Sequence, residues 1–124
     1  MHDAGTSVNK DLKVRTKDFA VRIIKLFAAL PKTVEAQVIG KQILRCGTSV
    51  GAQYRESQRA KSDADFISKI EGSLQELEET AYWLELVEEM KLFDSAKLEP
   101  LRSETKALIA IFITIAKKVK SRKH

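Results

Sequence analysis

The sequence predicts an all-α protein with four helices. Residues that favour helices (Ala, Leu, Glu, Lys, Ile and Arg) dominate its composition. Apolar residues recur at three- and four-residue spacings in four successive segments. The only two prolines, Pro31 and Pro100, stand where one helix can give way to the next. A chain of 124 residues, 44% of them hydrophobic, is long enough for one domain with one modest core.

The first helix is expected to begin near Thr16, which can act as its N-cap. Residues 1–14 are polar and show no clear apolar period, so they are expected to form a flexible N-terminal segment. Residues 15–120 would then form the bundle, followed by a basic tail over residues 121–124. Pro31 is expected to end this helix. Its apolar positions are Phe19, Ile23, Leu26, Phe27 and Leu30.

A second helix is expected from near Thr33, with Glu35 in its first turn. It runs on through a segment of small residues that includes Gly47, Ser49 and Gly51. A glycine inside a helix costs about 1 kcal/mol relative to alanine, so these positions indicate close packing or a local kink. The apolar residues expected to point inward are Val34, Val38, Ile39, Ile43, Leu44 and Val50.

The third helix is the best defined. Ser62 is a good N-cap, and Asp63 and Asp65 suit the positive end of the helix dipole. The helical pattern persists to about Met90, and Trp83 points to the side opposite the main apolar seam. That seam consists of Phe66, Ile70, Leu74, Leu77, Ala81 and Leu84.

The fourth helix is expected to begin at Asp94 or Ser95, either of which can cap it. Its apolar residues cover about 200° of the circumference, more than one core-facing stripe needs. Either a second copy of the chain covers the excess, which Trp83 also favours, or the first helix crosses over it. The two adjoining apolar faces are Leu108, Ile111, Phe112, Ile115 and Val119, and Ile109, Ile113 and Ala116.

Charge is distributed unevenly along the chain, although the net charge is only +5. Residues 1–61 carry 12 Lys and Arg against 5 Asp and Glu, residues 62–89 carry 1 against 9, and residues 90–124 carry 9 against 3. One interpretation is that the acidic helix packs beside basic ones. The other is that an exposed basic surface attracts an anionic polymer.

The residue patterns of two common kinds of catalytic site are missing from the sequence. The two histidines, His2 and His124, stand at the chain ends, so no Glu-x-x-His pair for a di-iron site and no internal histidine base exist. We therefore expect no catalytic residue, no metal and no cofactor. The single cysteine, Cys46, is expected to be buried and reduced, and no segment is long and apolar enough for a membrane. A cytoplasmic protein is predicted.

Three stretches of the sequence resemble a known family. Residues 42–56, QILRCGTSVGAQYRE, resemble the central motif of the bacterial 23S rRNA intervening-sequence proteins. Residues 62–66, SDADF, and residues 72–85, GSLQELEETAYWLE, are similar to the start and middle of that family's third helix. The resemblance covers about residues 12–118. Gln53 departs from it, since many relatives have Asn there, and so does Ser57, where Gly is common.

The resemblance implies an antiparallel up-down-up-down four-helix bundle that assembles as a homopentamer. The accessory variability-determinant proteins of diversity-generating retroelements are similar, and they bind nucleic acid and a reverse transcriptase. Many other relatives have no established activity. The residues expected at packing or subunit contacts are Gly47, Ser49, Gly51, Gln53, Glu56, Trp83, Ile109 and Ile113.

We hypothesise a non-catalytic, oligomeric protein that binds RNA or DNA or assists a ribonucleoprotein. An alternative is a scaffold for protein partners, such as a reverse transcriptase, without nucleic-acid binding. The basic residues expected to contact nucleic acid are Arg15, Lys17, Arg22, Lys25, Arg45, Arg55, Arg59, Lys117, Lys118, Lys120, Arg122 and Lys123.

Overall fold

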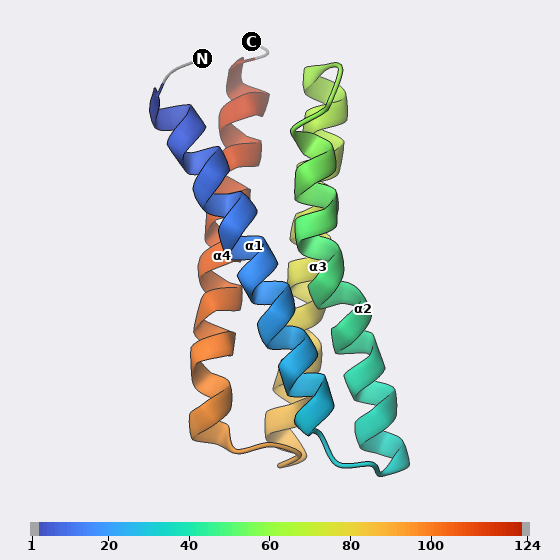
Figure 1. The fold of residues 1–124 in the computed structure, drawn as a ribbon. Helices are drawn as coiled ribbons and strands as arrows, with labels where there is room; N and C mark the ends of the chain where they lie inside the picture. Colours follow the sequence, from blue (N-terminus) through green and yellow to red (C-terminus); the bar gives the residue numbers. More distant parts are fainter. Residues whose placement is uncertain (1–2, 123–124) are drawn as a thin grey trace.

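The computed structural model describes residues 3–122, with side chains from residue 11 onward. These residues form α1 (Asp3–Ala29), α2 (Val34–Ser57), α3 (Asp63–Glu89) and α4 (Ser95–Arg122), and no strand occurs among them. The free ends of α1 and α4 lie at one end of the molecule, and the α1–α2 and α3–α4 connections lie at the other (Figure 1). The prediction of an all-α chain with four helices is confirmed.

The core runs along the whole length between the helices. Helix α2 packs most extensively on α3 and also on α1, α3 packs on α4, and α1 touches α4 least. In the last turn of α2 the ring of Tyr54 stacks on that of Phe112 of α4, with the two centroids 5.9 Å apart. Both side chains are buried, so this stacked pair joins α2 to α4 through the core.

Helix α1 begins earlier than the sequence predicted. Thr16 does not cap a helix: it is buried inside α1, and its hydroxyl donates to the Leu12 carbonyl over 2.7 Å. Leu12, inside the segment expected to be flexible, is itself fully buried. Leu12 and Thr16 extend the stripe of Phe19 and Ile23 by helical spacing, and packing therefore overrides the polar composition of this segment. Ser121 and Arg122 of the predicted tail are helical.

Helix α2 begins where the sequence indicated. The Thr33 hydroxyl accepts from the Ala36 N–H over 3.4 Å, which confirms the N-terminal boundary. The expected inward orientation of Val34 and Val38 is wrong, since these residues are 79% and 56% exposed. Both lie on the face of α2 opposite to Ala36 and Ile43, which are fully buried, and Val50 further along is fully buried as predicted.

The glycines of α2 lie against α1, as the packing interpretation required. A Cβ on Gly47 would stand 2.7 Å from Ile23 Cγ1, and a Cβ on Gly51 would stand 3.0 Å from Thr16 Oγ1. Gly40 is similarly close to Leu30. The missing side chains allow α1 and α2 to approach closely.

The remaining helix boundaries follow local side-chain chemistry. The Ser62 hydroxyl accepts from the Asp65 N–H over 3.0 Å at the start of α3. The Asp94 carboxylate accepts from the Ala96 N–H over 2.8 Å, so Asp94, one of the two predicted alternatives, caps α4. Pro100 does not separate two helices: it lies exposed within α4, past the first turn. Asp94 starts the helix before Pro100 is reached, and the helix continues beyond it.

The wide apolar face of α4 is covered within the chain. Ile109, Ile111 and Ile115 are half-buried and pack against the core. The large hydrophobic side chains that are exposed among the described residues lie elsewhere: Val14, Val21 and Ile24 on α1, Val34 and Val38 on α2, and Tyr82 and Met90 around α3. The exposed apolar surface that was predicted for the fourth helix is therefore found mainly on α1, on α2 and around α3.

Candidate nucleic-acid interface

Four of the predicted basic residues are bound to carboxylates within the chain. Arg15 donates two hydrogen bonds to Glu104, over 2.8 and 3.1 Å, and lies 3.8 Å from Asp11. The hydrogen bond to Glu104 raises the pKa of Arg15. The other three pairs are Arg45 with Glu76 and Glu79, Lys120 with Glu71, and Arg122 with Asp63. The interpretation that the acidic helix packs beside basic ones holds for Arg45, Lys120 and Arg122, whose partners lie on α3, whereas the partners of Arg15 lie on α4 and α1.

Seven of the predicted basic residues form no ion pair with any other described residue. They are Lys17, Arg22, Lys25, Arg55, Arg59, Lys117 and Lys118. Three lie on α1, two at the end of α2 and just after it, and two on α4. Lys123 lies outside the described residues. The predicted surface is therefore reduced to a smaller set of cations available to a partner.

Arg22 and Lys25 meet Lys97 across a groove between α1 and α4, called the basic groove below. Its lining consists of Arg22, Lys25 and Leu26 of α1, Phe93 of the α3–α4 connection, and Lys97, Leu98 and Leu101 of α4. Its volume is about 220 Å³, and no acidic residue lines it. The structure thus places three unpaired cations around an apolar floor.

Lys97 and Phe93 were not among the residues singled out from the sequence. Neither belongs to a recognisable motif, and they reach Arg22 only through the α1–α4 packing. The ion pair of Arg15 with Glu104 lies on the same two helices, about two turns before Arg22 on α1 and about two turns after Lys97 on α4. No local sequence pattern links residues so far apart along the chain, so the sequence alone does not predict this groove.

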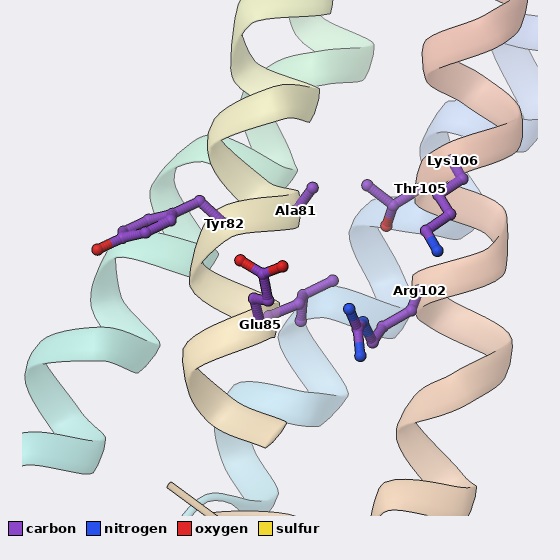
Figure 2. Close-up of a pocket in the computed structure, with 7 residues that line it drawn as sticks. Ala81, Tyr82, Glu85, Arg102, Thr105 and Lys106 are labelled. Atoms are coloured by element: carbon purple, nitrogen blue, oxygen red, sulfur yellow. The ribbon is translucent and has the colours of Figure 1, made fainter. Parts of the chain in front are cut away.

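A second groove lies between α3 and α4 (Figure 2). It has a volume of about 270 Å³ and is lined by Ala81, Tyr82, Leu84, Glu85, Arg102, Thr105 and Lys106. Figure 2 shows Tyr82 pointing away from α4, while Arg102 and Lys106 extend from α4. Arg102 forms an ion pair with Glu88, and Glu85 adds a further negative charge. Because both signs of charge are present, this groove selects less strongly for an anion than the basic groove does.

The residues predicted at packing or subunit contacts hold α2 mostly to its neighbours in the same chain. The Gln53 amide donates to Glu76 of α3 over 3.4 Å and packs against Gly72, and Glu56 pairs with Lys69 over 3.0 Å. The Ser49 hydroxyl donates to the Arg45 carbonyl, whereas Gly47 and Gly51 face α1. Ile109 and Ile113 are half-buried on α4.

Trp83 is the exception among these packing residues. Its ring packs half-buried against the core and meets Tyr82 edge to face at 5.2 Å. Its indole N–H is buried and has no hydrogen-bond partner in the described chain. A buried donor without an acceptor is unfavourable by about 1–3 kcal/mol, so this side of α3 is incompletely satisfied in a single chain.

Cys46 is buried as predicted. Its sulfur lies 3.0 Å from the Thr80 hydroxyl, and burial raises the pKa of the thiol. Within residues 3–122, no group of His, Cys, Asp and Glu side chains is arranged to hold a metal ion. None of the helices in that range is long and apolar enough to cross a membrane.

Comparisons with known proteins identify relatives of the chain. The model of the 23S rRNA-intervening sequence protein family matches residues 10–114. A crystal structure from Bacteroides thetaiotaomicron VPI-5482, described as a protein with unknown function from the S23 ribosomal protein family, is 38% identical. The match covers 88% of this chain and 97% of that one, with a TM-score of 0.82. Among proteins with curated descriptions, none matches.

Proposed function

This chain belongs to the 23S rRNA-intervening sequence protein family, and on that premise we propose that it is a non-catalytic, homo-oligomeric protein that binds RNA. The observation that supports binding is the set of cations left without carboxylate partners, concentrated where Arg22, Lys25 and Lys97 surround one groove. Release of counterions from a phosphate backbone favours binding to such a surface. We place this activity in the cytoplasm, where the thiol of Cys46 stays reduced.

RNA binding is tested by titrating a labelled structured RNA at several salt concentrations. The affinity should fall linearly with the logarithm of salt concentration. Lys25→Glu should weaken binding and lower the magnitude of the salt slope by about 1. Lys41→Glu is the matched control, because Lys41 is also exposed and forms no ion pair with another described residue but lies on α2. Absence of binding at low salt, or equal effects of the two substitutions, would contradict the proposal.

For the assembly we propose an antiparallel up-down-up-down bundle that associates into a ring of five copies. The exposed apolar residues Val34 and Val38, in the first turns of α2, and Met90, directly after α3, support self-association. The start of α2 and the end of α3 lie at the same end of the molecule, with the α1–α2 and α3–α4 connections (Figure 1). A ring would multiply each weak phosphate contact several-fold.

The oligomeric state is tested by light scattering coupled to gel filtration. A mass of about five chains is expected for the native protein. Val38→Asp should reduce the mass to that of a single chain, because a carboxylate would be placed in an apolar contact. Thr114→Asp, at an exposed position of α4, is the control and should leave the mass unchanged. A monomer at all concentrations would disprove the ring.

A protein scaffold that does not bind nucleic acid is the second candidate, and the same exposed apolar residues favour it. A reverse transcriptase is one partner to be tested. Copurification before and after nuclease treatment separates the two candidates: a partner that survives nuclease favours the scaffold. Loss of every partner on nuclease treatment favours RNA binding.

A further inference from the structure

The basic groove combines an apolar floor with a cationic rim. Leu26, Leu98 and Leu101 are buried at its base, each at most 6% exposed, and Phe93 is half-buried beside them. Arg22, Lys25 and Lys97 stand around this floor. Long basic side chains can lay their methylene stems on apolar surface while keeping the charge in water. A ligand that matches the groove therefore needs an apolar face next to a negative charge.

The acidic residue nearest to Phe93 in sequence forms no ion pair with these cations. Asp94 follows Phe93 directly, but its carboxylate accepts from the N–H groups of Ala96 and Lys97 at the start of α4, over 2.8 and 3.4 Å. Asp94 is also absent from the groove lining. Arg22, although half-buried, has no carboxylate partner among the described residues. The three cations thus line one groove and form no ion pair with a described carboxylate, which leaves them available to an anion.

The size of the groove limits what can enter it. Pockets for drug-sized ligands span roughly 300–1,000 Å³, and the basic groove, at about 220 Å³, is smaller. One planar ring system with its phosphate fits such a space better than a larger ligand. Nucleobases stack on aromatic side chains and on arginine guanidinium planes, and both groups are present here in Phe93 and Arg22.

Resting on the RNA binding proposed above, we infer that the basic groove holds one unpaired base of single-stranded RNA. The base stacks on Phe93 over the leucine floor, and the flanking phosphates contact Arg22, Lys25 and Lys97. In a duplex the bases are stacked inside and cannot enter the groove. The protein thus prefers single-stranded segments to paired ones, without reading a particular sequence.

The test compares a labelled single-stranded oligouridylate with a blunt-ended RNA duplex that carries the same number of phosphates, using fluorescence anisotropy. The single strand should bind about tenfold more tightly. Phe93→Leu should abolish that preference and leave the salt slope unchanged, since it removes the ring but no charge and keeps the core apolar. Phe93→Trp should keep the preference, because it keeps an aromatic ring. RNA binding should quench the tryptophan fluorescence of this variant more than that of the native protein, which comes from Trp83. Lys97→Gln should lower the salt slope of single-strand binding by roughly 0.7.

The outcomes separate this inference from RNA binding in general. If RNA binds but the single strand and the duplex bind equally, or Phe93→Leu keeps the preference in a variant with a native circular dichroism spectrum, the base site is disproved and RNA binding stands. If neither RNA binds at low salt, the proposed function itself fails. If polyglutamate binds more tightly than RNA and Phe93→Leu weakens it, the groove is instead a site for an acidic peptide.

Discussion

Gly47 of α2 lies directly against Ile23 of α1: a Cβ at Gly47 would stand 2.7 Å from Ile23 Cγ1 and 2.9 Å from Ile23 Cγ2. Both branches of the isoleucine crowd the same point, so a change of rotamer cannot clear it. Ile23 is also fully buried. The two residues together set how closely α1 and α2 approach.

Gly47→Ala should therefore lower the free energy of unfolding by about 1–2 kcal/mol. Crowding the core costs about 1–3 kcal/mol, which exceeds the gain in helix propensity of about 1 kcal/mol. Urea denaturation followed by circular dichroism measures the change. In the Ile23→Ala background the same substitution should cost at least about 0.5 kcal/mol less, because the clashing atoms are gone. Equal costs in both backgrounds would show that Ile23 is not the obstacle.

Lys91 ends α3 with a left-handed backbone, at φ 55°. The Leu92 N–H donates to the Val87 carbonyl over 3.0 Å, which is the pattern of a helix ending that glycine usually provides. Lys91→Gly should raise the free energy of unfolding by about 0.5–1 kcal/mol, because a residue with a Cβ is strained in this region. Lys91→Ala is the control and should show no such gain in urea denaturation. A lower urea midpoint for Lys91→Gly would contradict the backbone argument.

Tyr54 makes stability depend on pH in the alkaline range. Burial raises its pKa from 10.0 to about 12, so in the folded chain it stays neutral where the unfolded chain already ionises. Its contribution is fully present below pH 10 and is lost as the pH rises toward 12. The loss amounts to about 3 kcal/mol.

The check is the difference in unfolding free energy between the native protein and Tyr54→Phe, measured from pH 9 to 12. Phenylalanine cannot ionise, so Tyr54→Phe should lose less stability over this range. Tyr82, which is 54% exposed, gives a matched comparison: Tyr82→Phe should follow the native curve. Parallel curves for the native protein and Tyr54→Phe would mean that the pKa of Tyr54 is the same in the folded and the unfolded protein.

Cys46 should react with a thiol reagent only when the protein opens. The side chain is fully buried, and burial raises the thiol pKa, so little reactive thiolate is present in the native state. The rate of maleimide labelling at pH 8 should rise with urea in step with unfolding. The control is Cys46→Ala combined with Ser68→Cys, which moves the thiol to an exposed position of α3 and should label rapidly without urea. Rapid native labelling of Cys46 would contradict the buried placement.

The start sites of three helices could be read from the sequence. Thr33, Ser62 and Asp94 each satisfy a free N–H at a helix start, which is a local interaction between residues close in sequence. The same rule predicted an N-cap at Thr16 and was wrong there, because a hydroxyl that can cap a helix can also form a hydrogen bond inside one. In its case burial of Leu12 and contact with Gly51 decided the outcome.

The candidate site depended on contacts that the sequence does not display. Which cations are free is decided by pairs such as Arg15 with Glu104, and the basic groove exists because α1 and α4 bring Arg22 to Lys97. The sequence by itself determined that four helices form, where three of them start and that Gly47 marks a close approach. Only the tertiary structure decided which helix meets Gly47, which valines are exposed and which charges are compensated. Helix signals act over a few residues, whereas burial and ion pairing depend on groups that meet only after the helices have packed.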